Sequence, residues 1–389
     1  MDAGDQGGSE EGILITAAHT GARNPEREYG GPAPRRSPTI HDVAATAGVS
    51  KSTVSNVVRG LQNVSPATRN RVQEAIDDLG YTPNAIARQF VQRRTTTLGV
   101  LVGDLRNPYH AQLSRVVERA AFARGYTTMF CNIAVEDDLA IAGVEALLEH
   151  RVAGVVFIAL NAHESRLDET LQQGGVPTVF LGSSASWGDS VSPHDHHGGE
   201  LATRHLLDLG HRRIAFLRTP MVQRSADRDR HRAYQATMRL AGVPALPPYV
   251  WTPGAPTVDI GRRRLGLRDA FGGEGAPTAV FASNDAGAIA LIDGCERSGL
   301  RVPGDLSIVG FDDIDVSGLG RIALTTVAQS LDVAAARAVA LVLERIDSPM
   351  RGERHEIVEV ELRVRGTTAP IAARPSGRRT AAARPAPAS

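Results

Sequence analysis

Five polar side chains fall on one face of a short predicted helix near residue 55, at spacings of about one helical turn. They are Lys51, Ser52, Ser55, Asn56 and Arg59. Val54, Val57 and Val58 fall on the opposite face, which we expect to be buried. In the DNA major groove, lysine suits guanine, asparagine suits adenine, and serine contacts a base or a phosphate. The pattern therefore favours sequence-specific DNA reading, although a small helical bundle with a solvated polar face has the same pattern.

This polar face belongs to the middle one of three helices predicted within residues 39–79. Apolar residues with helical spacing occur at positions 40, 43, 44 and 47, and again at 72, 75, 76 and 79. Thr39 and Asp42 form a reciprocal capping pair for the first helix, and a Ser-Pro pair at 65–66 marks the start of the third. Gly48 lets the chain reverse between the first two helices. These signals predict a helix-turn-helix.

The charge distribution supports a phosphate-bearing partner for this region. The chain has a net charge of zero, but residues 35–97 contain nine Lys and Arg against four Asp and Glu, a net +5. Residues 1–34 contain two Arg against six acidic residues, a net −4. A basic segment of this kind suits a nucleic acid. Lys51 is the only lysine in the sequence.

Beyond residue 97, short apolar runs alternate with amphipathic segments, which is typical of parallel sheets with crossover helices. The predicted strands span residues 98–105, 127–132, 154–160, 178–181, 213–217, 278–282 and 307–310. They suffice for two doubly wound lobes, with a ligand site expected in the cleft at the carboxyl ends of the strands. We expect residues 1–37 and 372–389 to be disordered because their composition is poor in apolar residues.

Several function classes are disfavoured by the sequence. It contains no window apolar enough to span a membrane and no secretory signal, which favours a cytoplasmic protein. A sugar-binding transport receptor would fit the predicted lobes, but it would lack the helical head. A nucleotide-binding enzyme is disfavoured because no Gly-x-Gly-x-x-Gly motif follows the first strand and no nucleophile–base set stands out. No enzyme activity or cofactor is expected.

The run from Asp42 to Val58 resembles the DNA-binding head of the lactose repressor (LacI/GalR) family of bacterial regulators. The likeness continues through residues 64–69 and 79–88, and a weaker likeness extends to about residue 370. The resemblance implies an all-α helix-turn-helix head with a hinge helix over residues 38–97, followed by an α/β two-lobed sensor resembling periplasmic binding proteins over residues 98–371. It implies base-reading roles for Lys51, Ser52 and Asn56. It implies contacts to the DNA backbone from Ser50, Thr53, Ser55, Arg59 and Thr68, for which an ordinary capping role is the alternative.

Residues 83–91 match the family's hinge helix, which in relatives folds in the minor groove at the operator centre. The resemblance implies minor-groove contacts from Asn84, Ala87 and Phe90. Phe90 replaces the leucine wedge of relatives, and a phenylalanine remains a competent wedge between base steps.

The resemblance also implies an effector site in the sensor. Its residues would be Asp104, Tyr109, His110, Arg230, Trp251, Asn284 and Asp312. Loop packing is the alternative for Tyr109 and His110, and burial in a core is the alternative for Trp251. His110 replaces an apolar ring, which suggests an effector with a hydrogen-bond acceptor or a negative charge, or else a solvated histidine.

The implied function is that of a homodimer that binds a palindromic operator, represses transcription, and responds to a small polar effector. The effector is expected to be sugar-like or nucleoside-like, since an arginine, an aspartate and an asparagine together suit polyhydroxylated ligands. Gly182 stands where many relatives have a polar residue, which argues against a simple hexose. The turn at residues 194–197, His-Asp-His-His, suggests a metal site or, more simply, a polar loop near the cleft.

Overall fold

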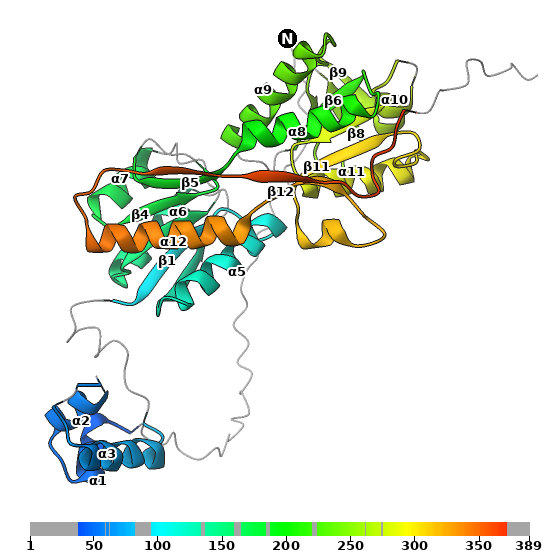
Figure 1. The fold of residues 1–389 in the computed structure, drawn as a ribbon. Helices are drawn as coiled ribbons and strands as arrows, with labels where there is room; N and C mark the ends of the chain where they lie inside the picture. The colour runs from blue at the N-terminus through cyan, green and yellow to red at the C-terminus, as the bar shows by residue number, and fades with distance from the viewer. Residues whose placement is uncertain are drawn as a thin grey trace, which may run out of the picture. The chain divides into compact units, whose positions relative to one another are not determined.

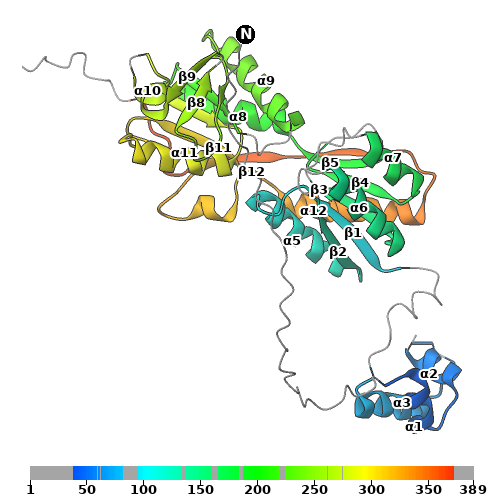
Figure 2. The same ribbon diagram turned by 180° about the vertical axis from the view of Figure 1, so that it is seen from behind.

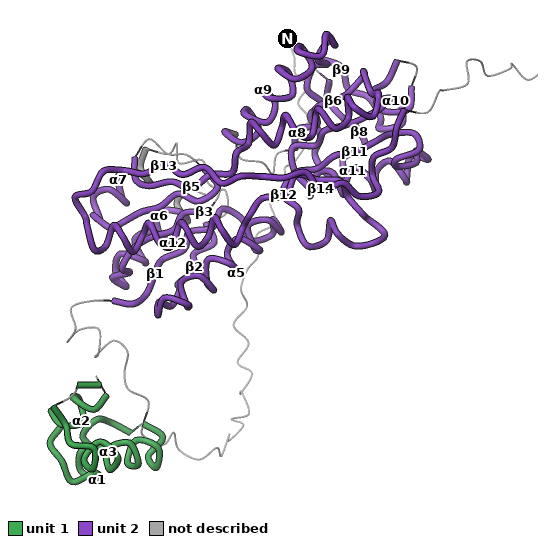
Figure 3. Tube along the Cα trace, in the orientation of Figure 1, with its two compact units in different colours: residues 1–88 green, residues 89–389 purple. Residues whose placement is uncertain are grey.

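The computed structural model describes residues 38–58, 60–61, 63–81, 95–133, 137–158, 165–183, 187–219, 224–260, 262–273 and 275–371. The chain divides into two compact units, residues 1–88 and residues 89–389 (Figure 3). None of the helices in the described part of the chain is long and apolar enough to cross a membrane.

The first unit holds three described helices, α1 (Ile40–Ala47), α2 (Lys51–Val58) and α3 (Pro66–Leu79). The predicted caps are present: the Thr39 backbone N–H and hydroxyl both donate to the Asp42 carboxylate at 2.7 Å, and Ser65 Oγ accepts from the Thr68 N–H. Gly48 ends α1 with a φ of 65°, a left-handed conformation that a glycine adopts without strain. Valines from all three helices are buried between them, which fixes the angle of α2 against its neighbours.

The second unit begins with lobe 1, a six-stranded sheet in the order β13-β5-β4-β3-β1-β2 in which all pairs are parallel. Its strands are β1 (Thr97–Val102), β2 (Thr127–Asn132), β3 (Gly154–Ile158), β4 (Thr178–Leu181), β5 (Asp189–Pro193) and β13 (His355–Val358). Its helices are α5 (Pro108–Phe122), α6 (Asp137–Glu149), α7 (Ser165–Gln173) and α12 (Leu331–Asp347). Side chains alternate across the sheet: Leu98 and Val100 pack with α5 and α12, whereas Leu101 packs with α6 and α7 on the other face. Figures 1 and 2 show these two layers of helices from opposite sides.

Lobe 2 contains an eight-stranded sheet in the order β14-β12-β11-β10-β6-β7-β8-β9. Its strands are β6 (Ile214–Arg218), β7 (Tyr249–Val250), β8 (Thr257–Ile260), β9 (Arg263–Gly266), β10 (Ala279–Ala282), β11 (Ser307–Asp312), β12 (Thr325–Gln329) and β14 (Val360–Arg363). Helices α8 (Asp195–Asp208) and α9 (Arg224–Leu240) cover one face, and α10 (Leu267–Gly272) and α11 (Asp285–Arg297) cover the other. A short 3-10 helix, η1 (Asp315–Gly318), follows β11.

Three described connections join the lobes, and each is one residue long between regular elements. They are His194 between β5 and α8, Ser330 between β12 and α12, and Glu359 between β13 and β14. These connections bond to one another: the His194 N–H donates to the Val358 carbonyl at 3.0 Å, and Ser330 Oγ donates to the Glu359 carbonyl at 3.3 Å. The continuous ribbon of β13 and β14 runs across both lobes in Figure 1. The hinge between the lobes therefore consists of three short segments joined by hydrogen bonds.

The predicted α/β organisation is confirmed, with two sheets rich in parallel pairs. Strands β2 and β4 have the predicted bounds, and the other predicted strands differ by a few residues at their ends. The sequence did not predict β5, β12, β13, β14 or the antiparallel β7–β9 ribbon. The sequence of β5, Asp-Ser-Val-Ser-Pro, shows why: three of its five residues are polar or acidic, so it lacks the apolar run expected of a buried strand.

Candidate DNA-binding helix and effector site

Helix α2 presents the polar face that the sequence predicted. Val54 and Val57 are buried, Lys51 and Ser52 are exposed, and Ser55 and Asn56 are half-buried. Lys51 and Ser52 form the first turn of the helix, next to the Gly48 turn, so their side chains are available to a partner. A recognition helix uses this end to reach base edges in the major groove.

Two of the predicted backbone-contact residues also hold the start of α2. Ser50 Oγ accepts from the Thr53 N–H at 3.1 Å, and it lies 2.8 Å from the Thr53 hydroxyl and 2.7 Å from the Ser52 hydroxyl. Thr68 has a similar place at the start of α3, where its N–H donates to Ser65 Oγ at 3.3 Å. These capping contacts agree with the alternative reading of the hydroxyls. The positive end of a helix dipole is also a place where a phosphate binds well, so these contacts do not exclude a role in gripping DNA.

Part of the predicted interface lies outside the described residues. Arg59 is one such position, and the predicted hinge residues Asn84, Ala87 and Phe90 are the others. Their roles stay predictions.

A buried cluster of charged groups lies at the carboxyl ends of the lobe 2 strands. Arg230, on α9, is only 4% exposed. Its Nε donates to Asp195 Oδ1 at 2.7 Å, and its NH1 donates to the Ser283 carbonyl at 2.6 Å. The same NH1 lies 3.7 Å from Asp312 Oδ1, and the guanidinium stacks 3.5 Å from the centroid of the Phe311 ring. The structure thus brings together Arg230 and Asp312, two of the predicted effector residues.

Tyr109 joins this cluster from lobe 1 through a residue that the sequence did not suggest. The Tyr109 hydroxyl donates to Gln329 Oε1 at 2.8 Å, and Gln329 Nε2 donates to Asp312 Oδ1 at 2.7 Å. Gln329 is the last residue of β12, immediately before the hinge residue Ser330. A chain of hydrogen bonds therefore runs from lobe 1 through the hinge to the charged cluster of lobe 2.

The backbone is strained at the end of β11, where Asp312 of the cluster lies. Asp312 has a φ of 125° and Asp313 a φ of 55°, which are unusual for residues other than glycine. Asp313 is held in place by Arg365 NH2 at 2.6 Å. Strain of this kind concentrates at binding sites, where the surrounding structure stabilises it.

Burial shapes the ionisation of this cluster. It raises the pKa of Asp312 well above its ordinary value, against the opposing effect of the Arg230 charge. Burial likewise raises the pKa of Asp195, again opposed by Arg230. Burial alone would lower the pKa of Arg230, but the charges of Asp195 and Asp312 outweigh it and raise that pKa. The guanidinium therefore stays charged, with two buried carboxyl groups beside it.

Asn284 lies beside the cluster with its side-chain carbonyl already in use. Asn284 Oδ1 caps α11 by accepting from the Gly287 N–H at 2.9 Å, and it accepts from the Thr219 hydroxyl at 3.2 Å. The next residue, Asp285, is fully buried and accepts from Ser317 Oγ and from the Ile314 N–H. Asp285 thus ties α11 to the segment that follows β11, and it supports the site from behind.

In lobe 1, Asp104 and His110 mainly organise their own loop. Asp104 is paired with Arg106 at 2.9 Å, whose hydrogen bonds lower the pKa of that carboxyl group. His110 Nδ1 lies 3.0 Å from the Asp104 carbonyl oxygen, and burial lowers the pKa of His110. A neutral, loop-bonded His110 agrees with the loop-packing alternative and gives no sign of a partner for a negatively charged effector.

Trp251 lies in the core of lobe 2. It is 2% exposed, packs in the apolar cluster between the sheet and helices α10 and α11, and donates its Nε1–H to the Ala255 carbonyl at 3.0 Å. The structure thus corresponds to the core alternative for this residue and not to a ring stacked on an effector.

The segment of residues 194–197 is the start of a helix and not the polar loop suggested by the sequence. Asp195 is the first residue of α8, and its carboxylate is turned toward Arg230. In the described part of the chain, no three His, Cys, Asp or Glu side chains are grouped so that they could hold a metal ion. The signal that pointed to Asp195 was available in principle, because an acidic residue directly after a strand and at a helix start lies at the ligand edge of such a sheet.

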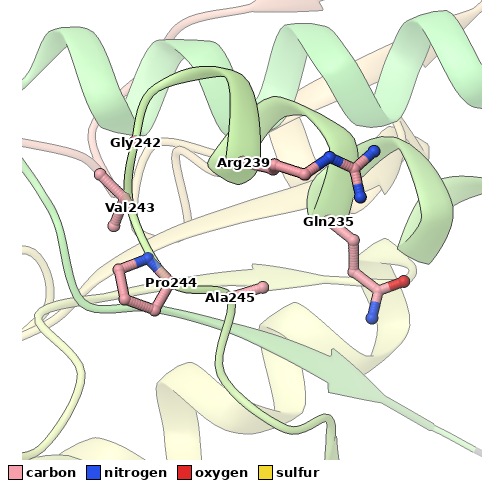
Figure 4. Close-up of a pocket in the computed structure, with 6 residues that line it drawn as sticks. All are labelled: Gln235, Arg239, Gly242, Val243, Pro244 and Ala245. Atoms are coloured by element: carbon pink, nitrogen blue, oxygen red, sulfur yellow. The ribbon is translucent and has the colours of Figure 1, made fainter.

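Cavities in the described part of the chain differ in their relation to this cluster. A small, mostly apolar cavity in lobe 1 is lined by Tyr109 and Gln329, which belong to the hydrogen-bond chain above, and by residues of β4, β5 and α12. A larger groove of about 510 Å³ is lined by Gln235 and Arg239 of α9 and by the turn at 242–245 (Figure 4). This groove contains none of the predicted effector residues, so we place the candidate effector site at the Arg230 cluster.

Comparison with known proteins agrees with these features. A model of the family described as "Bacterial regulatory proteins, lacI family" matches residues 39–84, and one described as "Periplasmic binding protein-like domain" matches residues 203–368. The ribose operon repressor of Escherichia coli (strain K12) is 34% identical over 313 residues, which cover 80% of this chain and 94% of that repressor. The chain belongs to the lacI family.

Solved structures of lacI-family proteins share the fold. The lac repressor dimer bound to operator and the anti-inducer ONPF is 27% identical, with a TM-score of 0.71, over 86% of this chain and all of that one. A LacI family transcriptional regulator from Enterococcus faecium with bound ribose is 28% identical, with a TM-score of 0.60, over 71% of this chain. As a lacI-family protein, the chain is a transcriptional regulator with a helix-turn-helix head and a periplasmic-binding-protein-like sensor.

Proposed function

We propose that this chain is a repressor that binds a palindromic operator as a homodimer and is controlled by a small polar effector bound between its lobes. The observation that carries the proposal is the pairing of two features in one chain. One is an exposed polar turn on α2, and the other is a charged cluster bonded across a hinge. The relatives named above include repressors and a sensor with bound ribose. Catalysis has no part in this proposal, and the chain would act in the cytoplasm, where operator DNA is found.

The base contacts of the proposed head come from Lys51, Ser52 and Asn56. Ser50, Thr53, Ser55, Arg59 and Thr68 grip the phosphates, and the hinge residues Asn84, Ala87 and Phe90 enter the minor groove at the operator centre. A base contact by a long side chain contributes about 1–3 kcal/mol of discrimination. Phosphate contacts contribute binding that depends on salt and not on sequence.

The first experiment tests the head. Operator fragments are selected from random DNA by the full-length protein, and binding is then measured by fluorescence anisotropy over a range of salt concentrations. We expect Lys51→Ala to weaken the selected site by about tenfold or more while non-specific DNA is affected less. Arg239→Ala, which removes one exposed positive charge from α9, is the matched control and should bind like the wild type. Equal loss in both variants would contradict base reading by α2.

The effector site of the proposal is built from Arg230, Asp312, Tyr109 and Asn284, with Asp104 and His110 shaping the loop that faces them. Arg230 and Asp312 are 4% and 6% exposed, so a ligand reaches them only when the lobes separate. An effector that binds one arrangement of the lobes better than the other shifts the equilibrium between the two arrangements. In the proposal, the hinge helix of residues 83–91 transmits this shift to the head.

The second experiment tests this coupling. Sugars and nucleosides are screened for a change in operator affinity, and Asp312→Ala is then compared with the wild type. We expect the variant to lose the effector response while effector-free protein still binds the operator. Asp315→Ala, at the exposed start of η1, is the control. An unchanged response in Asp312→Ala would remove Asp312 from the site.

A further inference from the structure

The Arg230 cluster holds more carboxyl groups than guanidinium groups, and its geometry restricts the effectors it can take. Arg230 has two aspartates for partners, Asp195 at 2.7 Å and Asp312 at 3.7 Å. The side chains of these three residues are 5%, 12% and 7% exposed, respectively. Solvent therefore screens the interactions within this cluster only weakly.

A second described arginine near this cluster already has an acidic partner. Arg218, at the end of β6, has its Nε 2.7 Å from Asp227 Oδ2. His231 lies next to Arg218, and burial together with the Arg218 charge lowers the pKa of His231 to about 4, so this ring is neutral near pH 7. The three aspartates paired with Arg230 and Arg218, namely Asp195, Asp312 and Asp227, therefore outnumber these two arginines.

Within the cluster, Asp195 is the carboxyl group that is hydrogen-bonded to the Arg230 guanidinium. It accepts from Arg230 Nε, while NH1 is engaged by the Ser283 carbonyl. Asp195 is also the first residue of α8, where the positive end of the helix stabilises a carboxylate. An anionic group of a ligand would have to displace Asp195 or lie beside both carboxylates, and either costs free energy.

We propose that Asp195 is a specificity-determining residue that reserves Arg230 for an internal carboxylate, so that the site takes neutral polyhydroxylated effectors and rejects their phosphorylated or carboxylated forms. The inference rests on the proposed function in that it concerns the same effector site. Hydroxyl groups of a neutral ligand can donate to Asp195 and Asp312 and accept from Arg230, so the excess of acceptors favours such a ligand. Replacing Asp195 by asparagine keeps the size of the side chain and removes its charge, leaving one carboxylate for one guanidinium.

The test uses the full-length protein and two anionic probes, inorganic phosphate and D-ribose 5-phosphate. Binding is followed by isothermal titration calorimetry at pH 7.5 and constant ionic strength, in the absence of DNA. In the wild type we expect no saturable binding of either probe in the millimolar range. In Asp195→Asn we expect saturable binding of at least one probe that is tighter by about tenfold or more, equivalent to about 1.4 kcal/mol.

Three further variants make the result decisive. Asp208→Asn, in the exposed last turn of the same helix, changes the net charge equally and should behave like the wild type. The double variant Asp195→Asn/Arg230→Met should lose the gained binding. Asp195→Ser serves as a second way to empty the position if the asparagine variant folds poorly.

Saturable binding of a probe by the wild type that is lost in Arg230→Met would overturn the proposal. So would the absence of any gain in both Asp195 variants, or a gain that survives in the double variant. Because these titrations contain no DNA, their outcome is independent of operator binding. A failure of the proposed function would appear in the anisotropy experiments and not here.

Discussion

At the scale of single residues, the surroundings of His231 lower the pKa of its ring, although His231 is not one of the proposed effector residues. His231 packs against the rings of Phe216 and Tyr234, with centroid distances of 4.9 and 5.9 Å. Its Nδ1 lies 3.3 Å from Arg218 NH2, and its Nε2 is buried with no hydrogen-bond partner among the described residues. Burial and the nearby positive charge both favour the neutral ring.

This environment predicts a loss of stability in acid. The pKa of His231 is about 4 in the folded chain, below the ordinary value of 6.5, so the unfolded chain binds the proton more tightly. Above pH 6.5 the ring is neutral in both the folded and the unfolded chain, so it does not make stability depend on pH. As the pH decreases from 6.5 toward 4, the unfolded chain takes up the proton first, and the free energy of unfolding falls. We expect His231→Gln to show a smaller decrease between pH 7 and pH 5 than the wild type, measured by urea unfolding at each pH. If the free energy of unfolding depended on pH in the same way in both proteins, the lowered pKa of His231 would be contradicted.

At the scale of elements, a buried ion cluster joins β5 to the end of α12. Asp189, the first residue of β5, has a fully buried side chain. Arg345 of α12 and Arg351, which follows that helix, each donate to its carboxylate through two nitrogens, at distances of 2.6 to 3.2 Å. Burial would raise the pKa of Asp189, but these two arginines and the Arg354 N–H hold it below its ordinary value. The start of this short, polar strand is thereby fixed to the end of α12.

Removing Asp189 should therefore be costly. Asp189→Ala leaves two arginines with low exposure and without their carboxylate, and breaking a buried ion pair in this way costs about 3–5 kcal/mol. We expect a corresponding decrease in the free energy of unfolding of the sensor, measured by urea titration. Asp347→Ala, on the exposed end of α12, is the control and should change stability by less than about 0.5 kcal/mol. A similar small effect at Asp189 would mean that the cluster contributes little.

At the scale of the whole sensor, the lobes contact each other beside the effector site. Ile314, which follows β11 of lobe 2, packs into the apolar core of lobe 1, and Tyr109 of lobe 1 bonds to Gln329 at the hinge. Both contacts lie close to Asp312, so a change at the effector site reaches the interface between the lobes directly. Rigid lobes joined by short segments respond by rotation about the hinge.

The Tyr109 contact should contribute to closure of the lobes on an effector. Tyr109→Phe removes the donor to Gln329 and leaves a part-buried acceptor, a change of about 1–3 kcal/mol. For the effector found in the screen, we expect a Kd increased by about fivefold to a hundredfold, measured by calorimetry, with unchanged operator affinity of effector-free protein. Tyr126→Phe, a partly buried tyrosine outside this chain of bonds, should leave the Kd unchanged. If Tyr109→Phe bound the effector with the same Kd as the wild type, the Tyr109–Gln329 hydrogen bond would not contribute to closure of the lobes.

The sequence was informative where the signal is local. The caps at Thr39 and Ser65 and the buried face of α2 depend on residues three or four positions apart, and the structure confirms them. The resemblance supplied Arg230 and Asp312, which the structure brings within 3.7 Å. The contact between Asp195 and Arg230 joins residues 35 positions apart on two helices, α8 and α9. It depends on how those helices pack, and no pattern of spacing encodes it.

Trp251 and Gln329 show the same limit in opposite ways. Trp251 has the residue type of an effector-stacking ring, but the β7 strand that precedes it was not predicted, and its ring is directed into the core. Gln329 looks like an ordinary polar residue, and only the pairing of β12 with β11 places it beside Asp312.

The exposed Lys51 has one more consequence, because the sequence contains no other lysine. Apart from the terminal α-amino group, its ε-amine is the only primary amine in the chain. An amine-reactive dye or a mass tag would therefore mark one defined point at the start of α2, without any engineered cysteine. The rate of that acylation would report on occupancy of the proposed reading helix, molecule by molecule, in the unaltered protein.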